Sequence, residues 1–327
     1  MCAGASSLTG RSRPPRVRLA VSAFPAQPPA VGLAARLKLA AADIKLSHSV
    51  FALPFALLGA VLARPVSEPW GVTAQKLALV VVCMVLARTW AMLVNRIADA
   101  RIDAENPRTA RRAVASGRLG MVHAKIFAGA CAALFVAACG AFWVLFANPW
   151  PIALALPVLG WLALYSFAKR FTAACHLLLG TALAISPIAA CLAVNPPHAL
   201  HPTILALAGF VTLWVAGFDV LYALQDEAFD RAKGLFSVPA MLGARRAVWA
   251  SRTMHLGAVC SLAAAWRLEP RFELLFGIAV GLAAMLLIFE HVVLVRRGLA
   301  GLPMAFFTLN GCVSVVVGGL GVIDALT

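Results

Sequence analysis

Long apolar segments constrain this chain more than any other feature of its sequence. Nine of them, each close to the ~20 residues that a helix needs to cross a bilayer, follow one another toward the C-terminus. They cover residues 46–64, 75–95, 121–143, 147–166, 174–194, 202–222, 246–266, 272–294 and 303–323. Only 13% of the residues are charged, against roughly 25% in soluble proteins. The sequence therefore predicts an all-α integral membrane protein with nine transmembrane helices.

The first 35 residues differ from the rest of the chain. They are rich in Arg, Pro, Ser and Ala, and no acidic residue precedes Asp43. They contain no apolar run long enough for a signal peptide or a membrane span. We expect residues 1–35 to be a disordered basic tail and residues 36–327 to form the membrane domain, with an Arg-rich organelle transit peptide as the alternative for the tail.

Lys and Arg residues divide the segment ends into two sets. The rich set carries Arg36, Lys38, Lys45, Arg96, Arg101, Arg108, Arg111, Arg112, Arg118, Lys169, Arg170, Arg231, Lys233, Arg245, Arg246, Arg296 and Arg297. The poor set carries Arg64, Lys76, Arg267 and Arg271. Cytoplasmic loops are the ones enriched in Lys and Arg, so the N-terminus and the rich loops are predicted to be cytoplasmic. This topology accounts for the net charge of +15, and nucleic-acid binding is not expected.

Cysteines and histidines give weaker signals. The eight cysteines form no C-x-x-C pair and lie mostly in apolar runs, where they are expected to serve as small packing residues. His48, His176 and His291 lie near the cytoplasmic ends of predicted spans. We interpret these histidines as residues of the membrane interface.

Acidic residues are rare and clustered. Of thirteen, seven fall in two twelve-residue windows, residues 95–106 and 219–230, at the ends of the second and sixth predicted spans. In the first window Asn95, Asp99 and Asp103 are spaced four apart. The second window places four polar residues at intervals of three, four and four: Asp219, Tyr222, Asp226 and Asp230. Each set is predicted to share one face of a helix.

Carboxylates at such spacing repel one another unless a cation neutralises them. Oxygen ligands suit Mg²⁺, which usually takes one or two carboxylates, substrate phosphates and water. The predicted ligands are Asn95, Asp99, Asp103, Asp219, Asp226 and Asp230. Two similar windows at corresponding places also suggest a repeated half, with one site where the halves meet. Solvated charged loops are the plainer alternative.

Basic residues accompany both windows. Arg108 and Arg112 follow the first window, and Lys169 and Arg170 follow the fourth predicted span. Cations so placed can balance the charge of a diphosphate, and Arg can bind it through two hydrogen bonds. For each single Arg, membrane topology alone is the competing explanation. The only two tyrosines of the chain, Tyr165 and Tyr222, lie within these motifs.

Together these motifs resemble the UbiA family of membrane aromatic prenyltransferases over roughly residues 40–325. The first signature is Asn95-x-x-x-Asp99-x-x-x-Asp103 followed by Asn-Pro-Arg-Thr. The second is Asp219-x-x-Tyr222-x-x-Gln-Asp226-x-x-x-Asp230, followed by Gly-x-x-Ser-Val-Pro. Tyr165-x-x-x-Lys169-Arg170 is similar to the loop motif between them. Ala113 and Ser166 depart from the family pattern, which often has Pro at both places.

The resemblance implies a UbiA-like helical bundle and a magnesium-dependent transfer of a polyprenyl group from its diphosphate to an aromatic ring. It implies catalytic roles for Asp99, Asp103, Asp226, Asp230 and Tyr222. Substrate binding would involve Asn95, Arg108, Arg112, Tyr165, Lys169, Arg170 and Asp219. Tyr222 would shield or stabilise the allylic cation through its π face.

The motifs around Lys45-Leu-Ser-His48 and His176 are similar to a bacterial branch of 4-hydroxybenzoate polyprenyltransferases. This implies an enzyme of ubiquinone or menaquinone biosynthesis in the bacterial inner membrane, with a cytoplasmic active site. Prenylation of a futalosine-type menaquinone precursor is the alternative. A cation-coupled transporter is the competing class of protein, although it would place its acids nearer mid-span. The oligomeric state stays open.

Overall fold

The structure is a computed structural model that describes residues 32–44 and 51–327. All regular structure in these residues is helical. The longer helices are α1 (Leu33–Ile44), α2 (Leu53–Ala63), α3 (Trp70–Ala98), α5 (Met121–Phe146), α6 (Trp150–Ala168), α7 (Cys175–Val194), α8 (Pro202–Ala223), α11 (Ala244–Leu268), α12 (Leu274–Arg297) and α13 (Asn310–Leu326). The short ones are α4 (Ala100–Glu105), α9 (Glu227–Lys233) and α10 (Val238–Leu242).

Two sequence predictions concern the N-terminal part of the chain. Residues 1–31 of the expected tail, and the segment that holds Lys45 and His48, lie outside the described residues. Helix α1 begins at Leu33, so the last residues of the expected tail, 33–35, are helical.

Seven helices within the described residues are long and apolar enough to cross a membrane. They correspond to α3, α5, α6, α7, α8, α12 and α13, so the chain is a multi-pass membrane protein. Nine spans were predicted. At the first, α2 is described over only 11 residues. At the seventh, α11 has 25 residues, but Arg245, Arg246, Arg252 and His255 make its N-terminal half polar. The count of nine is therefore not confirmed.

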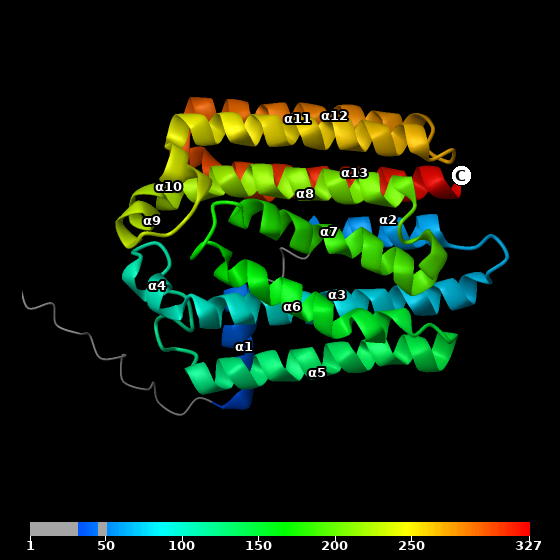
Figure 1. Cartoon of the computed structure of the whole chain (residues 1–327), viewed down its shortest axis with the longest axis horizontal. Helices are drawn as coiled ribbons and strands as arrows, with labels where there is room; N and C mark the ends of the chain where they lie inside the picture. The colour runs from blue at the N-terminus through cyan, green and yellow to red at the C-terminus, as the bar shows by residue number, and fades with distance from the viewer. Residues whose placement is uncertain (1–31, 45–50) are drawn as a thin grey trace, which may run out of the picture.

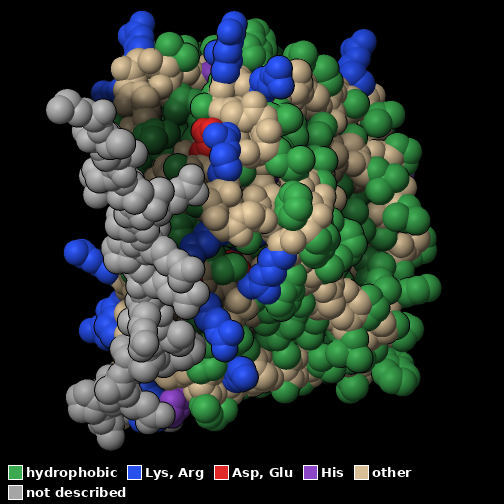
Figure 2. Space-filling model, turned by 60° about the vertical axis from the view of Figure 1, so that its left-hand side comes forward, with side chains coloured by type: hydrophobic (Ala, Val, Ile, Leu, Met, Phe, Trp, Pro, Cys, Tyr) green, Lys and Arg blue, Asp and Glu red, His purple; other side chains and the backbone are tan. Residues whose placement is uncertain are grey.

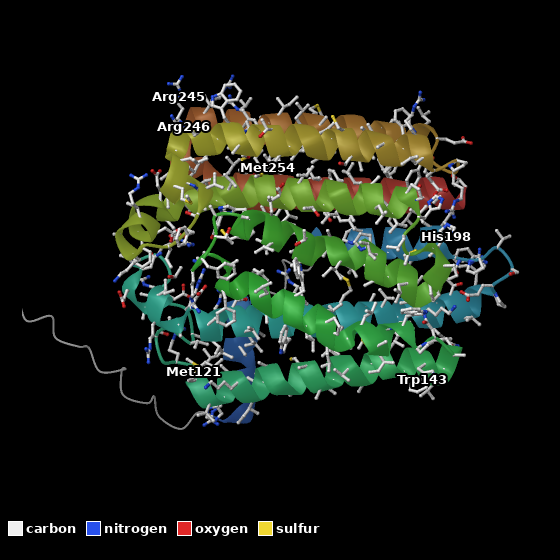
Figure 3. All side chains as sticks on the ribbon, viewed as in Figure 1. Met121, Trp143, His198, Arg245, Arg246 and Met254 are labelled. Carbon is white, nitrogen blue, oxygen red and sulfur yellow. The ribbon has the colours of Figure 1, made fainter. Side chains whose placement is uncertain are left out.

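The long helices lie side by side in one bundle (Figure 1). Helix α8 packs against α7 and α11, α3 against α5, and α13 against both α12 and α2. Helices α4, α9 and α10 gather at one end of the bundle, and the C-terminus lies at the other. Figure 3 labels Arg245 and Arg246 at the first end and His198 at the second. The charge-rich loops therefore share the end that holds both acidic windows.

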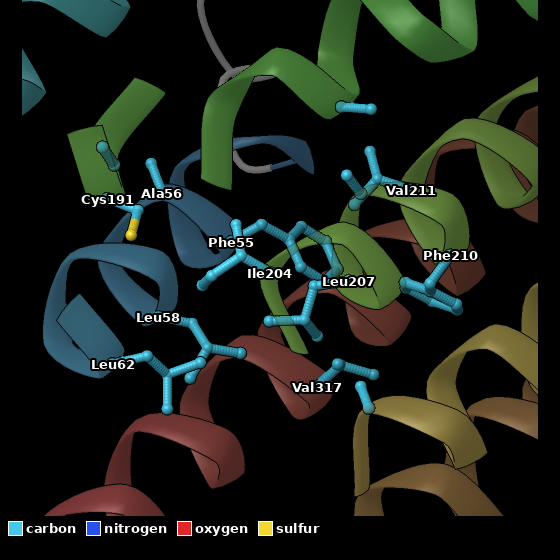
Figure 4. Packing of buried hydrophobic residues seen from close by; sticks show 14 of the residues in the cluster. Phe55, Ala56, Leu58, Leu62, Cys191, Ile204, Leu207, Phe210, Val211 and Val317 are labelled. Atoms are coloured by element: carbon cyan, nitrogen blue, oxygen red, sulfur yellow. The ribbon is translucent and has the colours of Figure 1, made fainter. Parts of the chain in front are cut away.

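The largest buried cluster surrounds the middle of α8. Phe55 and Leu58 of α2 meet Ile204 and Leu207 of α8, with Val317 of α13 beside them (Figure 4). Trp214 is fully buried in the same cluster. Lipid tails are as apolar as these side chains, so in a bilayer close packing contacts, rather than exclusion of water, hold such helices together.

Glycines allow some of these helices to approach closely. A Cβ atom on Gly59 of α2 would lie 2.5 Å from the carbonyl oxygen of Pro187 in α7. Because that neighbour is backbone, it cannot move aside as a flexible side chain would. Gly129 of α5 has nothing within 4 Å of the corresponding position.

We predict that Gly59→Ala destabilises the protein by about 1–3 kcal/mol through this backbone clash. Gly129→Ala is the matched control and is expected to leave stability unchanged or slightly higher, because Ala favours helix over Gly. Thermal unfolding of the detergent-solubilised variants measures the difference. Equal melting temperatures for the two variants would show that α2 and α7 are not packed this closely.

Candidate functional site

A cavity of about 860 Å³ lies between α3, α6, α7 and α8 and reaches the end of the bundle that holds α4 and α9. Its polar end is lined by residues of both acidic windows. Its deeper part is apolar and includes Val80, Phe135, Phe142, Leu154 and Ile188. Figure 2 turns this end forward and shows Lys and Arg side chains distributed over it.

The sequence predicted that the first window lies on one helix. In the structure this helix is interrupted. Helix α3 ends at Ala98, and α4 begins at Ala100. Asp99 between them has φ −93° and ψ 4°, in the bridge region of backbone space where many active-site residues lie. Hydrogen bonds still follow helical spacing, since Asp99 N donates to Asn95 O at 2.9 Å and Asp103 N donates to Asp99 O at 2.7 Å. All three predicted ligand side chains therefore line the cavity.

The second window is interrupted in the same way. Helix α8 ends at Ala223, a 3₁₀ turn covers Leu224–Asp226, and α9 follows. Asp226 has φ −105° and ψ 2°, close to the values at Asp99. Its neighbours in the motif also line the cavity: Asp219, Tyr222 and Asp230. Each window is thus interrupted at one aspartate, Asp99 in the first and Asp226 in the second.

Ion pairs neutralise these carboxylates and join the two windows. Arg108 pairs with both oxygens of Asp226, its Nε lying 2.9 Å from Oδ1, and Asn106 Nδ2 donates to the same oxygen at 2.9 Å. Arg112 Nη1 lies 2.8 Å from both oxygens of Asp103. The loop after the first window is therefore held against the second window, although the two are far apart in sequence.

Two pKa shifts outside the spans describe the electrostatics of this end. Burial raises the pKa of Asp99, although the nearby positive charge of Lys169 opposes that effect. Burial alone would lower the pKa of Arg108, but the hydrogen bond and charge of Asp226 outweigh it and raise the pKa. Burial thus disfavours the charged form of Asp99, whereas Arg108 and Asp226 stabilise each other's charged forms.

The basic loop after α6 contributes in two ways. Tyr165 and Lys169 line the cavity, as the sequence predicted for substrate-binding residues. Arg170 does not line it. Arg170 Nη2 instead donates to Ala98 O at 2.5 Å and to Asp99 Oδ1 at 3.0 Å. Its position supports the bend at Asp99 from outside the cavity.

His176, which the sequence analysis interpreted as a residue of the membrane interface, is the second residue of α7 and is buried inside the protein. Its side chain is 3% exposed, and Nδ1 lies 2.7 Å from Asp219 Oδ2. The backbone N–H of Val238 donates to Nε2 at 3.2 Å, so the Nδ1 atom carries the proton shared with Asp219. His291 packs in the bundle against His255, with ring nitrogens 3.1 Å apart. The sequence could not show that His176 is buried, because the residues that cover it belong to helices distant along the chain.

Sequence reasoning missed three polar residues of the cavity. Arg88 of α3, Ser166 of α6 and Ser186 of α7 line it, and each has a buried polar atom without a hydrogen-bond partner. Arg88 lies two helical turns deeper than Asn95. A charged residue inside a membrane span marks a functional site by default, and this signal was available at Arg88. The two serines gave none.

The oxygen atoms at the polar end of the cavity suit Mg²⁺ only in part. Within the described residues, no three His, Cys, Asp or Glu side chains are close enough to hold a metal ion. All six predicted oxygen ligands nevertheless line one cavity. Mg²⁺ ordinarily takes only one or two carboxylates and completes its shell with phosphate and water oxygens. The residues therefore fit a metal that binds together with a phosphate-bearing substrate.

Comparison with known proteins agrees with the resemblance seen in the sequence. The model of the UbiA prenyltransferase family matches residues 52–311. The 4-hydroxybenzoate octaprenyltransferase of Francisella tularensis subsp. novicida is 32% identical over 160 residues, which are 49% of this chain and 54% of that protein. The enzyme of the same name from Azotobacter vinelandii is 28% identical over 69% of this chain and 74% of its own length. The chain thus spans about half the length of the first relative (54%).

Solved structures show the same fold. The apo structure of a UbiA homolog from Aeropyrum pernix K1 superposes with a TM-score of 0.75 at 29% identity, covering 86% of this chain and 99% of that one. A UbiA homolog from Archaeoglobus fulgidus bound to GPP and Mg²⁺ superposes with a TM-score of 0.66. Its identity is 16%, over 88% of this chain and all of that one, so it supports the fold alone.

We predict that Asp99→Asn stabilises the protein when divalent cations are absent. The raised pKa means that folding disfavours the charged carboxylate, so the gain is present at neutral pH and disappears at acidic pH, where Asp99 is protonated. Asp226→Asn should destabilise the protein, because it weakens the pairing of the partly buried Arg108. Melting temperatures in EDTA between pH 4 and pH 8 test both. Destabilisation by Asp99→Asn at neutral pH would contradict this account.

Proposed function

The chain belongs to the UbiA prenyltransferase family, and from this premise we propose that it transfers a polyprenyl group from its diphosphate to an aromatic acceptor. We propose 4-hydroxybenzoate as the acceptor and quinone biosynthesis as the pathway, since curated relatives are named 4-hydroxybenzoate octaprenyltransferase. The observation that carries the proposal is the cavity, whose mouth holds both acidic windows with their arginines and whose remainder is mostly apolar.

The mouth suits a diphosphate and its metal. Bound Mg²⁺ would supply positive charge to the departing diphosphate. The residues proposed to hold it are Asn95, Asp99, Asp103, Asp219, Asp226 and Asp230. Arg108, Arg112 and Lys169 are proposed to bind diphosphate oxygens, with Arg170 supporting Asp99. A magnesium–diphosphate brings charges of both signs, so these arginines and carboxylates can exchange partners without leaving a buried charge unpaired.

The residues of the mouth then stabilise charge that moves during the reaction. As the allylic C–O bond breaks, its electron pair goes to the diphosphate oxygen, where Arg108, Arg112 and Lys169 stabilise it. A carbon of the acceptor ring forms the new C–C bond with the allylic carbon. The proton of that ring carbon leaves to solvent, which restores the aromatic ring. The apolar side chains of the deeper cavity hold the prenyl chain and exclude water.

Arg88 supports an acceptor that carries a carboxylate. It is the deeper of two charged side chains of α3 that line the cavity, the other being Arg96, and its Nε has no hydrogen-bond partner. A carboxylate on the acceptor would supply that partner, and a charge-assisted bond of this kind contributes about 1.5–3 kcal/mol. The same argument fits other carboxylate-bearing aromatic rings, including a futalosine-type precursor. A cation-coupled transporter is disfavoured, because the carboxylates gather at one end of the bundle with arginines that suit a phosphate.

The membrane topology of this enzyme is also a proposal. We propose nine spans, with α2 and α11 completing the seven apolar helices, and a location in the bacterial inner membrane. The charge-rich end that holds the cavity mouth is then cytoplasmic. Attachment of a membrane-impermeant label to single cysteines introduced at Arg101 and Val66, in inside-out and right-side-out vesicles, tests this orientation.

We predict that product formation from geranyl diphosphate and 4-hydroxybenzoate requires Mg²⁺ and stops when EDTA is added. Asp99→Ala and Asp226→Ala should each lower kcat by about 100-fold or more, because each removes stabilisation of the leaving group. Glu227→Ala is the control: this carboxylate does not line the cavity and pairs with Arg231. Full activity of both Asp variants would refute the site assignment.

A second prediction concerns the acceptor. Arg88→Gln should raise KM for 4-hydroxybenzoate about 10–100-fold and leave KM for geranyl diphosphate unchanged. Phenol lacks the carboxylate, so the same variant should alter its turnover little. Arg101→Gln, an exposed residue of α4, is the control. An equal loss with phenol and with 4-hydroxybenzoate would show that Arg88 does not bind the carboxylate.

A further inference from the structure

Four aromatic rings line one wall of the cavity just below its polar mouth. The centroid of the Phe306 ring lies 4.3 Å from that of Tyr222, at an interplanar angle of 35°. Phe218 meets Phe306 edge to face at 5.1 Å, and Phe51 does so at 6.0 Å. All four residues line the cavity. These four rings therefore pack against one another at the cavity wall.

Tyr222 is placed where a cation can reach its ring. It lies one helical turn before Asp226 and one turn after Asp219, and both carboxylates line the same cavity. Arg108 donates to the Tyr222 hydroxyl at 3.1 Å, and its guanidinium carbon lies 5.3 Å from the ring centroid. The aromatic wall thus begins where the proposed diphosphate site ends, at the depth expected for the first carbons of a prenyl chain.

An uncommon backbone conformation presents Phe306 to this wall. Residues Met304–Leu309 form a π-helix, a rare conformation that is frequent at functional sites. Asn310 holds the turn, since its Nδ2 donates to the carbonyl oxygen of Ala305 at 3.1 Å and to Glu290 at 3.2 Å. Its oxygen accepts from Trp214 Nε1 at 2.6 Å.

Asn310, Trp214 and Glu290 form a polar trio whose burial in the bundle is energetically unfavourable. Asn310 and Trp214 are 0% exposed and Glu290 is 1% exposed, in the interior of the bundle. Polar and ionisable side chains within a membrane are expensive, and where they occur they usually serve a function. Here the trio ties the π-helix to α12 and α8, and α8 carries Phe218 and Tyr222. The three side chains thus fix the position of Phe306 relative to Phe218 and Tyr222.

We propose that Phe306 is a catalytic residue that forms, together with Tyr222, the aromatic surface on which the allylic cation develops, and that Asn310 is the residue that positions it. This inference rests on the function proposed above. When the allylic C–O bond breaks and its electrons pass to the diphosphate, positive charge spreads over the allylic carbons. The π faces of Phe306 and Tyr222 stabilise this charge in a region without water, until the acceptor ring forms the new bond.

The test separates the effect of the aromatic ring at position 306 from the effect of side-chain volume. Phe306→Leu keeps an apolar side chain of similar size but removes the ring, so kcat with geranyl diphosphate, Mg²⁺ and 4-hydroxybenzoate should fall about 10–30-fold. KM for geranyl diphosphate should not change, because the lost interaction forms with the cation. Phe306→Tyr keeps the ring and should retain most of the activity. A side chain that only fills space would give the opposite order, with Leu tolerated and Tyr impaired.

Phe307→Leu is the matched control, because Phe307 belongs to the same π-helix but does not line the cavity. Equal kcat values for Phe306→Leu and Phe307→Leu would overturn the proposal. Melting temperatures of all variants separate a loss of folded protein from a loss of catalysis. An inactive wild-type protein would refute the proposed function itself and this inference with it, whereas an active wild type with an active Phe306→Leu variant would refute this inference alone.

The positioning role of Asn310 needs a separate measurement. Asn310→Leu should lower kcat about tenfold, because the π-helix loses the bonds that present Phe306. If Asn310 acts through Phe306, the double variant Asn310→Leu/Phe306→Leu should be no slower than the slower single variant. Independent structural damage would instead multiply the two losses, and this outcome would overturn the positioning role.

Discussion

The balance of buried charge at one end of the bundle is the constraint on which the rest of the site depends. Asp99 and Asp103 are buried, and a carboxylate without a partner in such surroundings is strongly disfavoured. Arg112 meets this demand for Asp103, and Arg108 does so for Asp226. Arg170 meets it only in part for Asp99, whose pKa burial still raises. These pairs connect the ends of α3, α6 and α8. The contacts that neutralise the charge therefore also hold these helix ends together around the cavity mouth.

The helices below this end serve a different purpose. Close contacts such as Gly59 of α2 against Pro187 of α7 hold helices of this part together. On the other side of the cavity the walls do not meet, and apolar side chains of α3, α5 and α6 line the space. A closely packed part and a hollow part within one bundle suit the long apolar chain that we propose as substrate.

Two polar residues inside the bundle, Arg88 and Asn310, differ in their surroundings. Arg88 points to a ligand, because it lines the cavity and its Nε lacks a partner. Asn310 lies outside the cavity and makes three hydrogen bonds, so its contribution passes through the backbone that it holds. Both are expensive in a membrane, and we propose that Arg88 binds a ligand while Asn310 positions the backbone.

The sequence by itself determined the membrane class, the polar end of the bundle and the candidate site residues. Apolar run length, Lys and Arg counts and acidic spacing are local properties, and the bilayer and the helix repeat translate them directly into structure. The sequence overestimated helix continuity at Asp99 and Asp226, because the bends there come from the backbone conformation. Only the tertiary structure decided that Arg108 meets Asp226, that His176 is buried against Asp219, and that Arg88 and Phe306 face one cavity. These contacts join helices that are distant along the chain, so no local pattern could have specified them.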